Sequence, residues 1–350
     1  MSDIPVRPRR RARYPGKNPR TFHQKYKELN PERYAAEVEK VTASGKTPAG
    51  SHRPIMVAEV LSCLQPSPGE VAVDCTLGGG GHALAILKQL QPGGRLVGLD
   101  VDPIELPRTV ARLRAAGYGP DTFIPRLGNF AGLPKALAEQ GLASADVVLA
   151  DLGVSSMQLD NPVRGFTYKE PGPLDMRMNP SKGEPASSLL ARTDETELAR
   201  LLTENADEPY AELIARILKA QPVTTTHLLE RVVRLGLTKT HPRLAKPDVK
   251  MSIRRTLQAL RIAVNDEFSA LDALLRALPL CLSPGGRVAV ITFHSGEDRR
   301  VKKAFQAGRR SGIYADVATE VIRSTMEETR ANRRASSAKL RWAVRASDPL

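Results

Sequence analysis

The chain has 350 residues, and 41% of them are hydrophobic, which is enough for two domains or for one domain with a large insertion. It has no apolar run of membrane-spanning length, and its arginine- and proline-bearing N-terminus has no secretory apolar core, so we expect a soluble, cytoplasmic protein. The cysteines Cys63, Cys75 and Cys281 are odd in number and widely spaced, which indicates buried small residues rather than disulfides or a zinc site.

The net charge of +14 comes from the two ends of the chain. Residues 1–50 carry 12 Lys/Arg and 5 Asp/Glu, and residues 299–350 carry 13 Lys/Arg and 5 Asp/Glu. The residues between them carry 27 Lys/Arg and 28 Asp/Glu, so their charges nearly cancel. Prolines interrupt the first segment, so we predict a basic, partly disordered extension over 1–50, of a kind that often contacts phosphate backbones. A solubilising tail is the plainer alternative, and a mitochondrial transit peptide is disfavoured by Asp3 and the prolines.

Strands and helices alternate after this extension. A capped helix is predicted over Asn30–Thr42 and a linker over Ser44–Ser51. The expected strands are Val71–Cys75, Leu96–Asp100, Phe123–Leu127, Val147–Asp151, Gly286–Phe293 and Ala338–Arg345. Helices lie between the first four, which predicts a parallel, doubly wound sheet of the Rossmann-like α/β class with right-handed crossovers.

The segment from Val71 to Leu87 reads as a buried strand, a carboxylate, a glycine turn and a helix start. Such a turn lets backbone N–H groups approach a nucleotide cofactor. Gly78, Gly80 and Ala83 fit the dinucleotide fingerprint, with Asp100 at the distance expected for a ribose-binding acid. Asp74 at the first strand tip would repel a pyrophosphate, whereas S-adenosylmethionine carries positive groups and no phosphate. A glycine turn that binds nothing is the remaining alternative.

The alternation stops after Asp151. Residues 156–250 show turn-rich sequence and helical periods without a strand, which predicts an all-helical insertion within a domain formed by 51–155 and 251–350. A single long helix is expected from Ile253 to Leu280. Ligands of such sheets bind at the carboxyl ends of the strands, where Asp74, Asp100, Phe130, Asp151 and His294 are all predicted to lie.

Seven ordered motifs between His52 and Arg345 carry a family resemblance. They are Gly78-Gly-Gly-Gly-His82, Asp151-Leu-Gly-Val-Ser-Ser-Met-Gln-Leu-Asp160, Arg164-Gly-Phe166, Gly172-Pro-Leu-Asp-Met-Arg-Met178, Gln258-Ala-Leu-Arg-Ile-Ala-Val-Asn265, Phe293-His-Ser-Gly-Glu-Asp-Arg299 and Ser337-Ala-Lys-Leu-Arg341. Together they closely resemble the bacterial ribosomal RNA small subunit methyltransferase H family, also called the MraW family. That family methylates N4 of a cytosine, at the position equivalent to 1402, in the decoding region of 16S rRNA.

The resemblance implies a class I S-adenosylmethionine-dependent fold with a helical insertion, and 16S rRNA of the small subunit as partner. It maps cofactor contacts onto Gly80, Gly81, His82, Asp100, Phe130, Asp151 and Gln158. Three features depart from the family pattern. The basic extension is additional, Met251-Ser252 stands where a His-Pro pair is usual while His241-Pro242 lies ten residues earlier, and the segment from Phe305 to Ser337 is shortened.

Methyl transfer to an exocyclic amine calls for alignment and for a hydrogen-bond acceptor on the amine. Asp151 is our first candidate, followed by Asp175 and His294; the plainer alternatives are a turn cap for Asp151, an Asx turn paired with Arg177 for Asp175, and a structural histidine. The sequence shows no metal cluster.

The target base must be unstacked, and single-stranded RNA is bound by basic surfaces with aromatic platforms. The predicted substrate-binding residues are Arg164, Phe166, Tyr168, Lys169 and Arg177. Alternatives from other classes are a methyltransferase for another RNA or a protein, a non-catalytic ribosome-binding protein and, least favoured, a dehydrogenase. The Gly-Lys-Ser/Thr end of a P-loop is missing, which argues against a nucleotide triphosphatase.

Overall fold

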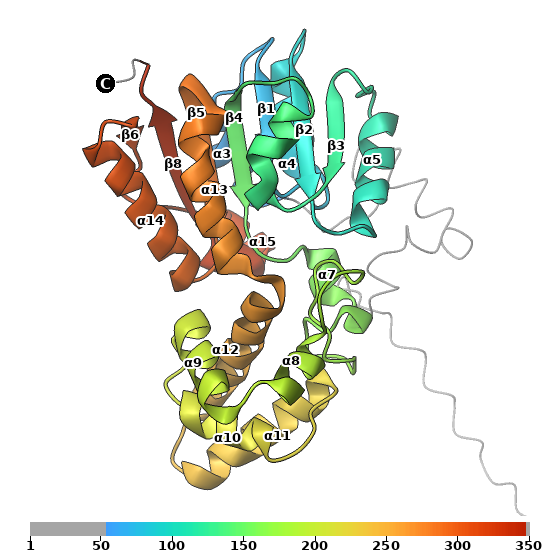
Figure 1. Ribbon diagram of the computed structural model, residues 1–350, viewed down its shortest axis with the longest axis vertical. Helices are drawn as coiled ribbons and strands as arrows, with labels where there is room; N and C mark the ends of the chain where they lie inside the picture. The colour runs from blue at the N-terminus through green and yellow to red at the C-terminus, as the bar shows by residue number, and fades with distance from the viewer. Residues whose placement is uncertain (1–53, 348–350) are drawn as a thin grey trace, which may run out of the picture. The chain divides into compact units, whose positions relative to one another are not determined.

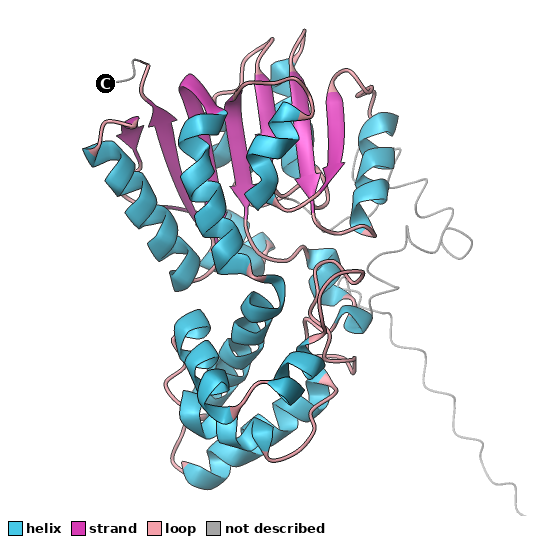
Figure 2. Cartoon of the chain, in the orientation of Figure 1, coloured by secondary structure: helices cyan, strands magenta, loops and turns pink. Residues whose placement is uncertain are grey.

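The computed structural model describes residues 54–347, so the predicted basic extension and the helix predicted over Asn30–Thr42 lie outside the described residues. Within that range the chain forms one sheet with strand order β3-β2-β1-β4-β5-β8-β6, and β7 pairs with β8 (Figures 1 and 2). The strands are β1 (Val71–Asp74), β2 (Arg95–Asp100), β3 (Phe123–Leu127), β4 (Ala145–Asp151), β5 (Leu282–Thr292), β6 (Tyr314–Val317), β7 (Ile322–Arg323) and β8 (Lys339–Arg345).

Strands β1 to β5 are parallel, and β8 is antiparallel to β5, β6 and β7. This arrangement confirms the predicted Rossmann-like, doubly wound class. The sequence reasoning missed β6 and β7, which are short and pair at the antiparallel edge. The order of strands reverses between β1 and β4, and at such a switch point the carboxyl ends of the strands leave room for a ligand.

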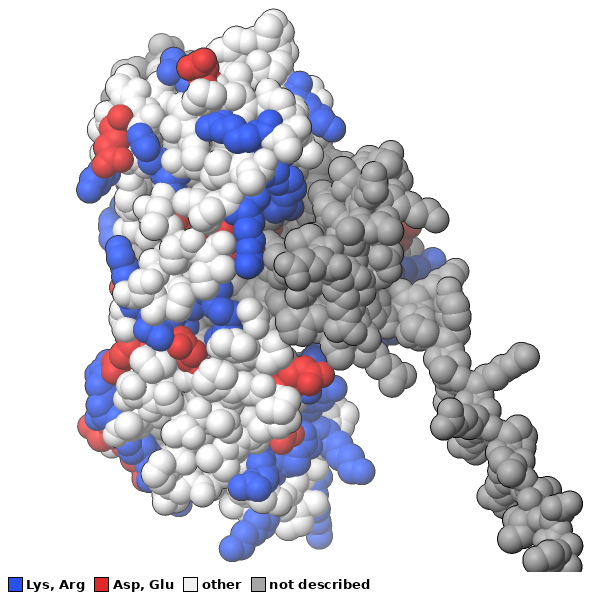
Figure 3. Space-filling view, turned by 90° about the vertical axis from the view of Figure 1, so that its right-hand side faces the viewer, with Lys and Arg blue, Asp and Glu red and all other residues white. Residues whose placement is uncertain are grey.

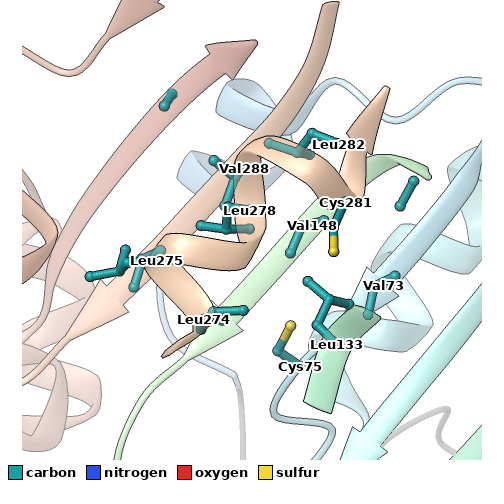
Figure 4. Packing of buried hydrophobic residues seen from close by; sticks show 14 of the residues in the cluster. Val73, Cys75, Leu133, Val148, Leu274, Leu275, Leu278, Cys281, Leu282 and Val288 are labelled. Atoms are coloured by element: carbon teal, nitrogen blue, oxygen red, sulfur yellow. The ribbon is translucent and has the colours of Figure 1, made fainter. Parts of the chain in front are cut away.

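Helices cover both faces of the sheet, which is why its strands read as continuous apolar runs. One face packs against α3 (Val57–Leu64), α4 (Gly81–Leu90) and α5 (Glu105–Ala115), and the other against α6 (Leu133–Ala138), α13 (Glu267–Cys281) and α14 (Ser295–Arg310). Side chains alternate between the faces: Val73 and Cys75 point toward α13, and Ala72 points away. Figure 4 shows Leu274 and Leu278 of α13 against this face.

A separate core belongs to the helical segment between β4 and α13. The segment contains α7 (Ser156–Asp160), α8 (Ala186–Arg192), α9 (Glu195–Ala206), α10 (Ala211–Lys219), α11 (Thr226–Thr240) and α12 (Lys246–Asn265). Three 3-10 turns, η2 (Phe130–Gly132), η3 (Pro162–Arg164) and η4 (Arg333–Ser337), and the short α15 (Met326–Ala331) complete the described elements. No helix of residues 54–347 has the length and apolar character needed to cross a membrane.

The prediction of a single helix from Ile253 to Leu280 is wrong, because two helices, α12 and α13, cover this range. The chain breaks at Asp266, whose φ of 50° and ψ of 42° are left-handed, a conformation that Asp tolerates better than most residues. Just before the break, the Asn265 side chain accepts the Met178 N–H at 2.7 Å and donates to the Met176 carbonyl at 2.8 Å. α12 therefore packs with the helical segment, which extends to residue 265 rather than ending at 250.

We predict that Leu278→Ala lowers the free energy of unfolding by about 3 kcal/mol, because Leu278 is fully buried between α13 and the sheet and its loss leaves a cavity. Urea denaturation measures the change. Leu280→Ala is the matched control on the same helix: its side chain is 78% exposed, so a shift below about 0.5 kcal/mol is expected. Equal effects of the two variants would contradict the described packing of α13.

Candidate active site

Asp151 ends β4 at the switch point. Its backbone N–H donates to Thr76 Oγ1 at 2.6 Å, which ties the tip of β4 to the turn after β1. Its Oδ1 atom is buried and finds no hydrogen-bond partner among the described residues. Burial, followed by the nearby Glu297 carboxylate, raises the pKa of Asp151 to about 7. Asp151 thus presents an acceptor atom that the fold leaves unused.

Two further carboxylates end the neighbouring strands. Burial raises the pKa of Asp74 at the end of β1 to about 6, against the lowering effects of His82 and of the Thr76 N–H. Burial also raises the pKa of Asp100 at the end of β2 to about 6, although the N–H groups of Asp102 and Gly78 donate to it at 2.8 and 2.7 Å. Three acids that are costly to ionise therefore lie at adjacent strand ends, where a cationic ligand would stabilise them.

His82 lies against Asp151, with Nδ1 3.6 Å from Oδ2. Its Nε2 is 2.9 Å from the Ile55 carbonyl, which can only accept, so Nε2 carries the hydrogen. Burial lowers the pKa of His82. At 3.6 Å its Nδ1 is too far from Asp151 Oδ2 for a hydrogen bond, so the ring lies beside the carboxyl group without satisfying it.

The glycine turn has packing reasons for its glycines in addition to the predicted approach of a ligand. Gly80 has a φ of 71°, and a Cβ there would lie 2.7 Å from Thr109 Cγ2 of α5. A Cβ on Gly81 would lie 2.7 Å from Pro54 Cγ. Gly78 also has positive φ, and its carbonyl accepts from the Thr109 hydroxyl at 2.5 Å. The turn is therefore fixed against α5 before any ligand binds.

Gln158 and Arg164 are held in a buried network around Asp102. Asp102 Oδ2 accepts from Gln158 Nε2 and from Arg164 Nη1, each at 2.7 Å. Arg164 Nη2 also donates to the carbonyls of Arg177 and Met178 at 3.1 and 2.7 Å. The predicted substrate role of Arg164 is not supported, because its guanidinium is buried in this ion pair. The Gln158 amide is likewise taken up by Asp102 and by the Ser155 N–H.

The other two catalytic candidates have structural partners. Both oxygens of Asp175 accept from the Arg177 guanidinium, at 2.9 and 2.8 Å, and Oδ1 also accepts the Arg177 N–H. These contacts lower the pKa of Asp175 despite the opposing effect of burial. His294 is the N-cap of α14: Nδ1 accepts from the Glu297 N–H, and Nε2, which has no hydrogen-bond partner of good geometry among the described residues, lies 3.1 Å from Glu297 Oε1. The geometry thus favours the Asx-turn and structural-histidine alternatives and leaves Asp151 as the one candidate of the three with a free acceptor.

The predicted aromatic platform is only partly present. Phe166 is 7% exposed and belongs to the core of the helical segment, so its predicted stacking on a base is not supported. Tyr168 is half-buried against the same core, and Lys169 is exposed. Phe130 begins η2 at the carboxyl end of β3 and is half-buried. Tyr168, Lys169 and Phe130 stay predictions as ligand contacts.

Sequence reasoning missed the residues that hold the site together. Thr76 fixes the backbone of Asp151, Asp102 joins Gln158 to Arg164, and Asn265 holds the backbone of Met176 and Met178. The available signal was the Asp102-Pro103 pair, since Asp before Pro at a helix start is a frequent cap. The Oδ2 atom of Asp102 accepts from Arg164, which lies 62 positions later in the sequence, and no local pattern predicts such a contact.

The fold and the three acids at its switch point are typical of Rossmann-like α/β proteins that bind a nucleoside-containing cofactor. Residues 49–346 match the model of the MraW methylase family, and the chain belongs to that family. It is 48% identical to ribosomal RNA small subunit methyltransferase H 2 of Alkaliphilus metalliredigens, over 96% of this chain and 97% of the relative. It is 45% identical to ribosomal RNA small subunit methyltransferase H of Myxococcus xanthus, over 83% of this chain and 96% of the relative.

These coverages qualify the expectation that the basic extension departs from the family. The family model begins at residue 49, but the Alkaliphilus alignment covers 96% of the chain and so includes most of residues 1–50. Overall likeness to solved structures is low. An rRNA methylase from Streptococcus thermophilus has a TM-score of 0.38 at 10% identity, over 83% of this chain and 93% of that one. Aeropyrum pernix fibrillarin with natively bound S-adenosyl-L-methionine has a TM-score of 0.38 at 11% identity, over 82% of this chain and 74% of that one.

We predict that Asp151→Asn stabilises the ligand-free protein at pH 8 but not near pH 4. Because folding raises the Asp151 pKa from 3.8 to about 7, the wild type carries a penalty that is absent below pH 4, grows as the pH rises and levels off above 7. A quarter of the side chain is exposed, so we expect a gain on the order of 1–3 kcal/mol at pH 8. Urea denaturation across this pH range checks it, with the exposed Asp121→Asn as control. A difference that does not change with pH would contradict the assignment.

We predict that Arg164→Met destabilises the protein by about 3–5 kcal/mol, because Asp102 has no exposed surface and would keep a buried charge without its cation. Arg177→Met is the matched control: the Arg177–Asp175 pair is more than a fifth exposed on both sides, so about 1 kcal/mol or less is expected. Chemical denaturation of both variants measures the difference. Similar losses in the two would show that Arg164 is not buried as described.

Proposed function

We propose that this protein transfers a methyl group from S-adenosylmethionine to the exocyclic N4 amine of a cytosine, at the position equivalent to 1402, in 16S rRNA of the small ribosomal subunit. The observation that carries the proposal is the unpartnered, buried Oδ1 of Asp151 beside two further acids at the switch point. Membership in the MraW methylase family and relatives named as ribosomal RNA small subunit methyltransferases support the target.

The crevice fits a cationic, phosphate-free donor. S-adenosylmethionine supplies an electrophilic methyl group on a positively charged sulfur. Asp74, Asp100 and Asp151 pay a desolvation cost when ionised, and a positive ligand would offset it, whereas a pyrophosphate would increase it. Asp100 ends β2, where an acid can accept from ribose hydroxyls, and Phe130 at the end of β3 offers a ring beside an adenine.

Asp151 acts on the acceptor amine. Its free Oδ1 accepts an N–H of the amine, which orients the nitrogen toward the methyl group and stabilises the positive charge that develops there. Thr76 holds the Asp151 backbone in place during this step. With a pKa of about 7, Asp151 can also take the proton that the nitrogen loses.

The helical segment recognises the RNA in this proposal. In the described part of the chain, the sheet domain comprises residues 54–155 and 266–347, and the helical segment 156–265 lies between them in the sequence. The turn-rich stretch after α7 carries the exposed Lys169 and the half-buried Tyr168, and in this proposal both contact a nucleotide next to the target. The basic extension 1–50 and the basic C-terminal part would add phosphate contacts.

The proposal predicts N4-methylcytidine at one decoding-region position. Small subunits that lack this methylation are incubated with the protein and labelled S-adenosylmethionine, and mass spectrometry identifies the nucleoside. We expect Asp151→Ala to lower kcat on the order of 100- to 1000-fold, because the acceptor for the amine is removed. Asp121→Ala, an exposed acid at the start of β3, is the control and should leave the rate unchanged.

Other outcomes separate the alternatives. Cofactor binding without transfer to the subunit would point to another RNA or to a protein substrate. Absence of cofactor binding would favour a non-catalytic ribosome-binding protein. Full activity of Asp151→Ala together with a strong loss in Asp175→Asn or His294→Gln would reverse the order of the catalytic candidates.

A further inference from the structure

The turn between α11 and α12 carries a concentration of positive charge that the site does not use. Over residues 239–250 there is one acid, Asp248, and four exposed cations. These four are Lys239, Arg243, Lys246 and Lys250, and we call this surface the basic tip. The basic tip does not show in the net charge of residues 51–298, which is close to zero because acids elsewhere in this range balance its positive charge.

Within residues 54–347, none of the four cations of the basic tip forms an ion pair with a carboxylate. Several arginines elsewhere in the segment do: Arg192 with Glu184, Arg200 with Glu197 and Glu204, Arg216 with Glu195 and Arg234 with Glu230. A cluster of unpaired cations on a rigid helical turn leaves a positive potential that attracts polyanions.

Ring and apolar groups accompany the charge. His241 caps the end of α11 and lies with its ring centroid 5.0 Å from that of Tyr210. Leu235 on α11 and Met251 on α12 are 60% and 44% exposed. The His241-Pro242 pair lies ten residues before the place where the family usually has a His-Pro pair, and in the structure it belongs to the basic tip. Met251 and Ser252, which stand at that usual place, lie within α12. Cations next to exposed rings are typical of surfaces that bind single-stranded or irregular RNA.

The basic tip is far from the crevice but rigidly connected to it. α12 has 20 residues and thus spans roughly 30 Å. At its far end, Asn265 binds the backbone of Met176 and Met178, and the Met178 carbonyl accepts from Arg164 of the Asp102 network. An RNA that places its target base in the crevice would therefore meet the basic tip at nucleotides well away from that base. Lys and Arg side chains project from this helical part at the bottom of Figure 3.

We propose that the basic tip is a second RNA-docking surface, which binds the phosphate backbone of the substrate rRNA away from the methylated base and contributes to affinity rather than to the chemical step. This inference rests on the proposed function for the identity of the RNA. It predicts that loss of the tip charge raises KM, leaves kcat at saturating subunits nearly unchanged, and lowers the salt dependence of binding.

The test compares two charge-matched triple variants of the full chain. One is Lys239→Glu/Arg243→Glu/Lys246→Glu in the basic tip. The control is Lys88→Glu/Arg95→Glu/Arg276→Glu, three exposed cations on α4, β2 and α13 of the sheet domain. Methyl transfer to small subunits gives kcat and KM, and fluorescence anisotropy with protein-free 16S rRNA gives affinity against salt. Thermal unfolding checks the fold of each variant, and a Gln triple at the tip replaces the Glu triple if that one is unstable.

We expect the tip triple to raise KM about 10- to 100-fold and to reduce the slope of log K against log salt by about 2, as for the loss of three phosphate contacts, with kcat within twofold of wild type. Equal KM and slope for the tip and control triples would overturn the inference. If the wild type binds rRNA but does not methylate the subunit, the proposed function fails; the anisotropy slopes then still decide whether the basic tip binds RNA.

Discussion

The buried carboxylate of Asp102 is the contact on which the site depends. It has no exposed surface, its Oδ1 accepts the Ile104 N–H at 2.9 Å, and its Oδ2 binds Gln158 and Arg164. Since its own N–H donates to Asp100, this residue connects the acid at the end of β2 to the start of the helical segment. A buried pair of this kind is costly to break, which makes the geometry between sheet and helices well defined.

The crevice combines that rigid frame with unfavourable electrostatics. Asp74, Asp100 and Asp151 all have raised pKa values because the fold buries them, and the lowering effect of His82 on Asp74 does not offset that burial. Buried carboxylates with raised pKa values are common at functional sites, where a positively charged ligand supplies the counter-charge that the protein lacks. The same arrangement explains why a positively charged, phosphate-free donor fits better than a dinucleotide.

The two cores separate the acids of the sheet from the exposed cations of the helical segment. The sheet and its covering helices place the acids, whereas the helical segment builds its own core and carries exposed cations at its far turn. α12 reaches from that turn to the Asn265 contacts, and Asn265 and Arg164 both bind the backbone of Met178. The far turn is thus linked to the Asp102 network through one helix.

Much of the fold was predictable from local patterns. Apolar runs separated by amphipathic helices predicted the bounds of β1 to β4 to within two residues, because β-strands buried on both faces have a strong sequence signal, whereas β5 begins four residues before its predicted start. The carboxylates at strand ends followed from topology, since all parallel strands end at one edge. The break at Asp266 and the short strands β6 and β7 were not predictable, because a single left-handed residue and a two- to four-residue strand carry little local signal.

The sequence by itself determined the fold class, the family and the set of polar residues at the strand ends, since these depend on periodicity and on ordered motifs. Only the tertiary structure decided which of those residues keep a free polar atom. From sequence, Asp151 was the first catalytic candidate, with Asp175 and His294 after it, and Arg164 was expected to bind substrate. Long-range contacts then paired Arg164 with Asp102, and local ones paired Asp175 with Arg177 and His294 with Glu297, leaving Asp151 with a free oxygen. Which polar group stays unpaired depends on the whole packing, and no local pattern contains that information.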